Sequence, residues 1–249
     1  MAPFRITDAQ REQYRDEGFM LLEQAIPDRD LEALRAQCTA LVQEQEAEMD
    51  RLGGDTVNLS RRNSRYFVFL PFKTHPQLGE FIFNDLMGEI CKATVGENAM
   101  LFWEQFVVKG TDKKGAEFGW HQDSGYVDHP HTPYVNAWIP LDDVSEENGT
   151  IYLLPFSRAG VREKVQHKTV EGSSDRVGYF GNDPGIPFIA PAGSIAVFSS
   201  VTFHRSGANR TSRMRRAYAI QYSPEVIYEP DGSLKGLAEP FLQGGRRVR

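Results

Sequence analysis

The sequence has 249 residues, of which 40% are hydrophobic and 25% are charged. This globular composition excludes collagen-like, low-complexity and disordered proteins. The net charge of −6 gives no general attraction to nucleic acid or to an anionic membrane, so neither is expected as a partner. The chain has only two cysteines, so no disulfide framework can form and a cytoplasmic location is expected.

The first part of the chain, residues 1–98, is predicted to be a mostly helical shell. Thr7 and Asp8 can cap a first helix, and Gly18 supplies its end. Apolar periodicity predicts further helices and short strands in this part of the chain. These are helices over about 28–49 and 76–95 and strands over 19–22 and 66–70.

After Gly96 the pattern changes to short strands separated by Gly, Pro, Asn and Asp. The predicted strands cover residues 100–108, 134–141, 151–154, 194–199 and 216–222. This spacing favours an antiparallel sandwich or barrel. The fold class expected is therefore mainly β with a helical N-terminal shell. We expect one domain over 1–249, in which a β core over 99–223 is followed by a C-terminal extension over 224–249 with a frayed end.

The segment His121-Gln122-Asp123 carries the sharpest chemical signal. Residues i and i+2 of a strand point to the same side, so the imidazole and the carboxylate can reach one cation. A second imidazole from His204 would complete a two-histidine, one-carboxylate set, which is typical of non-haem Fe(II) oxygenases. The motif alone is weak, because a surface turn beside an edge strand explains it equally well.

Two neighbouring segments indicate a polar cavity beside this motif. The 134–141 segment alternates, with Tyr134, Asn136 and Trp138 on the face opposite its apolar residues. In a regular strand Arg215 shares one side with two alanines and a glutamine, which leaves room for a ligand that its planar guanidinium could bind through a carboxylate. Arginines at 210, 213 and 216 lie nearby, and spacing alone does not say which one is solvated.

Five motifs occur in an order that resembles the phytanoyl-CoA dioxygenase family, over roughly residues 15–223. They are Trp120-His-Gln-Asp123, Asn136-Ala-Trp-Ile-Pro-Leu141, Glu147-Asn-Gly-Thr150, Leu154-Pro155, and His204-Arg-Ser-Gly207 with Arg215 eleven residues after His204. Members of this family are Fe(II)- and 2-oxoglutarate-dependent oxygenases on a double-stranded β-helix, a cupin-like jelly roll. The resemblance therefore implies Fe(II), 2-oxoglutarate as cosubstrate, and O₂.

The resemblance also assigns expected roles to single residues. It implies that the iron ligands, which are also the catalytic residues, are His121, Asp123 and His204. It implies that Arg215 pairs with the distal carboxylate of 2-oxoglutarate and that Ser206 assists it. The other positions expected to line the cosubstrate pocket are Gln122, Trp138 and, with less support from the spacing, Gln105. The sequence departs from the family at Phe156 and Arg158, where a glycine and a histidine are common, and this puts the shape of that loop in question.

The expected reaction is hydroxylation of an unactivated C–H bond in a small-molecule metabolite. Because Asp123 is a carboxylate where related halogenases have Gly or Ala, halogenation is disfavoured. Desaturation or another oxidative rearrangement stays open, as do a cupin-like metal enzyme that does not use 2-oxoglutarate and a non-catalytic binding protein. The sequence is compatible with a monomer or a small homo-oligomer.

Two groups of basic residues hint at an anionic substrate. Such residues can border the active-site mouth in this family, although a solvated charge run explains them equally well. They are Arg61, Arg62 and Arg65 before one predicted strand, and Lys109, Lys113 and Lys114 before the metal motif.

Overall fold

The helices lie mainly in the first hundred residues. The computed structural model describes residues 4–112 and 117–249 of the chain. Its helices are α1 (Asp8–Glu17), α2 (Asp28–Leu52), α3 (Gly79–Ile82), α4 (Asp85–Thr94) and α5 (Phe156–Ala159), with short 3₁₀ turns η1 (Pro71–Lys73), η2 (Pro76–Leu78) and η3 (Asp123–Tyr126).

Local capping explains where α1 begins and ends. The Thr7 side chain accepts a hydrogen bond from the backbone N–H of Gln10, and the Gln10 side chain accepts one from the backbone N–H of Thr7. Gly18 follows the helix with a φ of 82°, a left-handed conformation that favours glycine. The predicted bounds of this helix and the predicted start of α2 at Asp28 are confirmed.

The single helix predicted over 76–95 is wrong. The segment contains η2, α3 and α4, with a break at Phe83 and Asn84. Asn84 has an extended backbone, and its side chain accepts a hydrogen bond from Met87 N–H at 2.9 Å, so it starts a new helix. The apolar periodicity continues through this break, which is why the pattern alone predicted one helix.

The strands are mostly short and pair in antiparallel fashion, and the first of them is β1 (Phe19–Leu22). The remaining strands of the N-terminal half are β2 (Thr56–Val57), β3 (Ser60–Arg61), β4 (Arg65–Phe69), β5 (Ala99–Lys109) and β6 (Phe118–His121). Those of the C-terminal half are β7 (Val135–Pro140), β8 (Ile151–Leu154), β9 (Lys168–Thr169), β10 (Arg176–Val177), β11 (Ile186–Pro187), β12 (Ile195–Ser199), β13 (Phe203–Ser206), β14 (Arg215–Ser223), β15 (Glu239–Gln243) and β16 (Arg246–Arg247).

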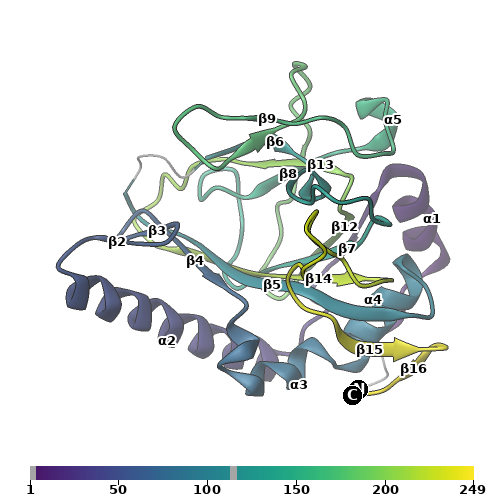
Figure 1. Ribbon diagram of the computed structural model, residues 1–249, viewed down its shortest axis with the longest axis horizontal. Coiled ribbons are helices and arrows are strands. Elements are labelled where there is room, and N and C mark those ends of the chain that lie inside the picture. Colours follow the sequence, from purple (N-terminus) through teal and green to yellow (C-terminus); the bar gives the residue numbers. More distant parts are fainter. Residues whose placement is uncertain (1–3, 113–116) are drawn as a thin grey trace.

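Two antiparallel sheets form the core of the described structure. The large sheet has the strand order β1-β12-β7-β14-β5-β4-β3-β2, with β15 and β16 added beside β5. The small sheet has the order β11-β8-β13-β6. Figure 1 shows the small sheet on one side of the large sheet, with α2 and α3 on the other. This arrangement is the jelly roll with a helical N-terminal shell that the sequence predicted.

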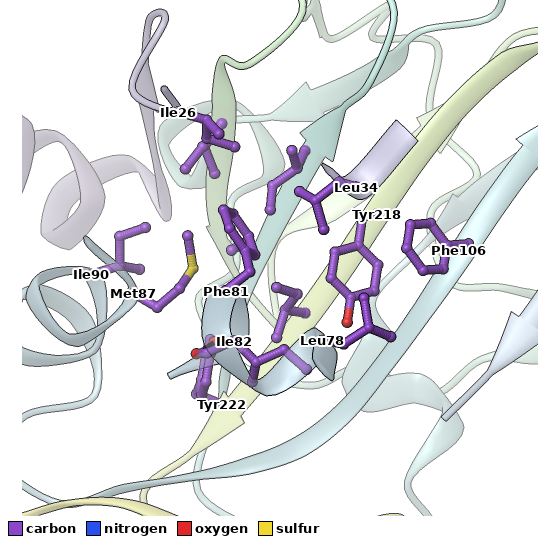
Figure 2. Packing of buried hydrophobic residues seen from close by; sticks show 14 of the residues in the cluster. Ile26, Leu34, Leu78, Phe81, Ile82, Met87, Ile90, Phe106, Tyr218 and Tyr222 are labelled. Atoms are coloured by element: carbon purple, nitrogen blue, oxygen red, sulfur yellow. Dashed lines mark hydrogen bonds between the residues drawn. The ribbon is translucent and has the colours of Figure 1, made fainter. Parts of the chain in front are cut away.

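The main hydrophobic core lies between the helices and the outer face of the large sheet. Figure 2 shows Leu34 of α2, Ile82 of α3 and Met87 of α4 in one cluster with Phe106 of β5 and Tyr218 of β14. The rings of Phe106 and Tyr218 stack with centroids 4.2 Å apart. Because side chains alternate along a strand, the residues next to these in β5 and β14 face the interior between the sheets.

The strand register places these inward-facing residues in rows. Ala219 of β14 lies opposite Gln105 of β5 on one side and Trp138 of β7 on the other. At one end of the same strands Arg215 lies opposite Lys109. The floor of the space between the sheets is therefore built from alternate residues of three adjacent strands.

The C-terminal end is more ordered than the sequence predicted. Residues expected to fray instead form the hairpin of β15 and β16, in which Leu242 lies opposite Arg247. Edge pairing of β15 with β5 is a long-range contact that no local pattern in the tail indicates. In the described parts of the chain, none of the helices combines the length and the apolar composition needed to cross a lipid bilayer.

Candidate active site

His121, Asp123 and His204 come together although the histidines are far apart in the sequence. His121 is the last residue of β6, and Asp123 opens the η3 turn that follows it. His204 lies in β13, directly opposite His121 in the antiparallel pair of the small sheet. Strand pairing therefore fixes the two imidazoles side by side, and the turn after β6 adds the carboxylate.

The three side chains converge on one point. Asp123 Oδ1 lies 3.8 Å from His121 Nε2 and 3.5 Å from His204 Nε2. One ligand atom from each of the three residues lies within 4.8 Å of the other two. The imidazole rings have centroids 4.1 Å apart and are tilted rather than stacked. Two nitrogens and one oxygen can thus bind the same ion.

Backbone hydrogen bonds set the orientation of both imidazoles. His121 Nδ1 lies 2.8 Å from the carbonyl oxygen of Gly119, and His204 Nδ1 lies 3.2 Å from that of Thr202. A neutral imidazole that donates through Nδ1 presents the lone pair of Nε2, which suits metal binding. Burial lowers the pKa of each histidine to about 4, so both are neutral near pH 7.

The Asp123 carboxylate is held by β14. Gln221 Nε2 donates a hydrogen bond to Asp123 Oδ2 at 3.1 Å, which leaves Oδ1 facing the histidines. Burial raises the pKa of Asp123, while the neighbouring His121 and amide hydrogen bonds act in the opposite direction. A cation at this point would favour the ionised carboxylate. Gln221 is a site residue whose role the sequence did not predict, although it shares a strand face with Arg215.

The donor set fits a ferrous ion. Two imidazoles and one carboxylate on one face leave coordination positions open, and the set includes no thiolate. Structural zinc sites are usually closed by four protein ligands. The three residues would hold the iron, and the open positions would be available to cosubstrate and O₂.

A cavity of about 420 Å³ surrounds this centre, within the range of small-molecule sites. It lies between the sheets and is lined by residues from both. The predicted site residues that line it are Gln105, His121, Asp123, Trp138, His204, Ser206 and Arg215.

Arg215 forms one end of the cavity. Its side chain is buried, and Nη2 donates a hydrogen bond to the carbonyl of Gly149 at 3.1 Å. The guanidinium carbon lies 5.4 Å from the centre of the Trp138 ring. Its buried Nε has no hydrogen-bond partner among the described residues. An orphaned buried donor in a cavity fits an anionic ligand, and burial lowers the pKa of Arg215 to about 10, so it remains charged.

Ser206 lies near Arg215 and is bonded to a residue that the sequence did not place in the site. Lys109 Nζ donates to Ser206 Oγ at 2.8 Å and also to the carbonyl of Gly207. Lys109 is buried at the end of β5, because residues 105, 107 and 109 alternate toward the interior. The same alternation that selects Gln105 could have identified it.

The expectation for Gln122 needs correction. Its fully buried side chain donates to the carbonyls of Glu163 and Val201 and accepts from Val165 N–H. It does not line the cavity, because neighbouring residues of an extended segment point to opposite sides. Gln122 therefore ties the motif to the surrounding loops instead of facing the cosubstrate.

The departure at Phe156 and Arg158 leaves the centre intact. These residues form the short helix α5, where Arg158 Nε donates to Asp183 at 2.9 Å. The Phe156 ring packs closely against Gly18, just before β1. A Cβ atom at Gly18 would lie only 2.5 Å from this ring. The substitutions thus build a local ion pair and a packing contact away from the metal ligands.

Of the basic residues that hinted at an anionic substrate, the four that the structure describes do not line the cavity themselves, but Arg65 and Lys109 lie 5.8 and 5.6 Å from the centres of the Phe67 and Phe118 rings, which do. Arg62 pairs with Asp50 and Asp55, and Arg61 is exposed. Lys109 is buried against Ser206 and is not a loop cation. The positions of Lys113 and Lys114 lie outside the described residues.

The jelly-roll fold, the two-histidine, one-carboxylate centre and the buried arginine define a class, the non-haem iron oxygenases. The sequence matches the family described as phytanoyl-CoA dioxygenase (PhyH) over residues 14–217. The chain belongs to this family, and the protein is an Fe(II)- and 2-oxoglutarate-dependent dioxygenase.

Individual relatives agree with this assignment. The chain is 24% identical over 230 residues to the peroxisomal phytanoyl-CoA dioxygenase of Mus musculus, covering 87% of this chain and 68% of that protein. Its fold is similar to that of the α-ketoglutarate-dependent carbocyclase SnoK from nogalamycin biosynthesis, with 17% identity, a TM-score of 0.72, and coverage of 93% and 90% of the two chains. The epimerase SnoN, in complex with Fe³⁺, α-ketoglutarate and nogalamycin RO, has 18% identity, a TM-score of 0.72, and coverage of 97% and 95%.

Proposed function

We propose that the protein hydroxylates an unactivated C–H bond of a small-molecule metabolite. In this reaction 2-oxoglutarate and O₂ yield succinate and CO₂, one oxygen atom entering succinate and the other the hydroxyl group of the product. The observation that supports the proposal is the Asp123 carboxylate, whose Oδ1 lies within 3.8 Å of Nε2 of both histidines and which we assign as the third protein ligand. A carboxylate here would fill the position that a halide would need, which favours hydroxylation over halogenation.

The residues of the cavity fall into two groups, one that holds the iron and one that binds 2-oxoglutarate. We propose that His121, Asp123 and His204 hold the iron, which when bound supplies the oxidising chemistry. Arg215 binds the distal carboxylate of 2-oxoglutarate, and Ser206 donates its hydroxyl to the same group. A charge-assisted pair is strong here because burial excludes competing water.

Two further residues position the cosubstrate. Trp138 lies against the Arg215 guanidinium and walls the cosubstrate end of the cavity. Gln105 lies opposite Ala219 and accepts a hydrogen bond from Trp103 Nε1 at 3.2 Å, which points its amide into the cavity. We assign Gln105 to the boundary between cosubstrate and substrate.

Other oxidative outcomes remain alternatives to hydroxylation. Desaturation and rearrangement use the same centre and differ only in how the substrate lies, and the structural neighbours SnoK and SnoN are a carbocyclase and an epimerase. The product decides among them. A substrate screen read by succinate release, followed by mass spectrometry, should find a product heavier than its substrate by one oxygen atom. A product lighter by two hydrogens, or of unchanged mass, would refute hydroxylation.

The metal assignment is tested by replacing the carboxylate. Asp123→Ala should lower substrate-dependent succinate formation at least about 100-fold, because a ligand is lost. The matched control is Asp128→Ala, which removes an exposed carboxylate paired with Arg176 and should leave turnover unchanged. Normal turnover by the Asp123 variant would contradict the proposal, and product formation without added 2-oxoglutarate would favour a cupin-like enzyme.

We also propose that residues 1–249 act as one domain in the cytoplasm. One hydrophobic cluster joins the N-terminal helices to the large sheet, which supports a single folding unit. Cys38 and Cys91 are buried free thiols, as suits a reducing compartment. A single cooperative unfolding transition and recovery in the cytosolic fraction are the expected results.

A further inference from the structure

Four aromatic side chains form one wall of the cavity on the side of β4 and β5. This aromatic wall consists of Phe67, Phe69, Trp103 and Phe118. Phe67 and Phe69 stack with centroids 5.7 Å apart, and Phe118 and Trp103 meet them edge-on at 5.7 and 5.9 Å. Phe67 is buried, but Phe69 is 36% exposed, so part of the wall is open. An apolar surface left open inside a cavity is a place for a ligand.

The strand register puts the Phe69 and Trp103 end of the aromatic wall near the metal centre and away from Arg215, whereas Phe118 lies opposite Ser206 at the other end. Trp103 lies opposite Gln221, the residue that bonds to Asp123. Phe69 lies opposite Gln105, one strand further from the centre. Arg215 is at the other end of β14, opposite Lys109. A molecule on Phe69 and Trp103 would therefore reach the iron without occupying the cosubstrate end.

The cations that line the described cavity are already engaged. The Arg205 guanidinium lies 3.7 Å from the centre of the Tyr152 ring and donates to the carbonyl of Pro184. Lys235 pairs with Glu229 at 2.6 Å. Arg215 is assigned to 2-oxoglutarate. The cations that contact the aromatic wall lie over its other two rings, Arg65 over Phe67 at 5.8 Å and Lys109 over Phe118 at 5.6 Å. Among the described residues no cation lies over Phe69 or Trp103, so an anionic group stacked on these two rings would lose hydration without an ionic partner.

We propose that the substrate is a neutral, flat, ring-containing apolar molecule that stacks on the aromatic wall. The inference rests on the oxygenase function proposed above and adds the class of substrate. Offset or edge-on contact with Phe69 and Trp103 orients such a ring, and the surrounding apolar side chains exclude water. A hydrogen-bonding substituent is matched by the Gln105 amide, which is the polar side chain between the wall and the cosubstrate end.

Binding is tested with three probes of similar size. These are 2-acetylnaphthalene, the anion 2-naphthoate, and the saturated analogue 2-acetyldecalin. Calorimetric titrations use the full-length enzyme with Fe(II) and 2-oxoglutarate under anaerobic conditions. The neutral aromatic probe should bind at least about tenfold more tightly than the anion and more tightly than the saturated ring. Equal or tighter binding of 2-naphthoate or 2-acetyldecalin, or no binding of any probe, would overturn the proposal.

A variant pair locates the binding. Phe69→Ala should weaken 2-acetylnaphthalene about tenfold, since a stacking contact and buried area are lost. Phe180→Ala is the matched control, because Phe180 is 66% exposed and lies outside the cavity. This variant should bind 2-acetylnaphthalene with the affinity of the wild type. Equal effects of the two substitutions would refute the aromatic wall as the site. These experiments measure binding and do not depend on turnover. Failure of the probe to stimulate succinate release would therefore count only against the oxygenase function, and not against binding to the aromatic wall.

Discussion

Lys109 Nζ donates a hydrogen bond to Ser206 Oγ at 2.8 Å, which joins the end of β5 in the large sheet to β13 in the small sheet. Both residues lie beside Arg215. The pKa of Lys109 is lowered mainly by burial and, as the second cause, by the positive charge of Arg215. An incoming dicarboxylate would offset this repulsion. We therefore expect Lys109 to act as a positioning residue that orients the Ser206 hydroxyl.

Lys109→Met should raise the KM for 2-oxoglutarate about tenfold, because the hydrogen bond that orients the Ser206 hydroxyl is removed. Iron affinity and kcat at saturating 2-oxoglutarate should change little. Succinate release at varied 2-oxoglutarate measures the effect, with the exposed Lys168→Met as control. An unchanged KM would show that Lys109 only joins the two sheets.

Gln221→Leu should lower Fe(II) affinity about 10- to 100-fold. The amide holds Asp123 Oδ2 at 3.1 Å, and loss of such an outer partner leaves the ligand free to rotate. Anaerobic Fe(II) titration gives the affinity, and Gln77→Leu, which removes an exposed amide bonded to Gln37, serves as control. Wild-type affinity in the Gln221 variant would mean that Gln221 is not needed and that Asn136 and the histidines suffice to orient the carboxylate.

Arg215→Lys should raise the KM for 2-oxoglutarate by about 100-fold while iron still binds. Lysine keeps the charge but loses the planar fork that matches a carboxylate at two points. Arg213→Lys is the matched control, since this exposed arginine lies just before the same strand. If both variants bind 2-oxoglutarate equally well, Arg215 is not its anchor.

Local patterns in the sequence predicted most of the elements and part of the site. The cap at Thr7, the strand at 151–154 and the face of Tyr134, Asn136 and Trp138 depend on neighbours along the chain, and the structure confirms all three. The expectation that Gln122 lines the cosubstrate pocket came from the family resemblance and not from the residues, and strand alternation contradicts it. Applied consistently, this rule would have turned Gln122 away from the cavity.

Other features depend on pairing between distant strands. The contact of Lys109 with Ser206 spans 97 residues, and the tail finds its partner at the edge of β5. Neither register can be predicted from local periodicity, because a strand carries the same pattern whichever neighbour it has. The aromatic wall arises in the same way, from β4, β5 and β6 meeting at one side of the cavity.

Glu104 gives the fold a pH dependence that is independent of the iron site. The carboxyl is buried beneath the large sheet, where Phe72 N–H and Tyr218 O–H both donate to it at 2.8 Å. Burial raises its pKa from 4.5 to about 7, against the opposing effect of these hydrogen bonds. The folded state therefore keeps its proton between pH 4.5 and 7, where the unfolded state has lost it.

It follows that the free energy of unfolding falls as the pH rises from about 4.5 to 7, by up to about 3 kcal/mol from this group. Glu104→Gln should remove this component. Urea unfolding of the metal-free protein at pH 5 and pH 7.5 measures it, with the exposed Glu12→Gln as control. Because both proteins share the titrating histidines, their contribution cancels in the difference. A pH dependence equal to that of the wild type would show that Glu104 is ionised in the folded protein at pH 5.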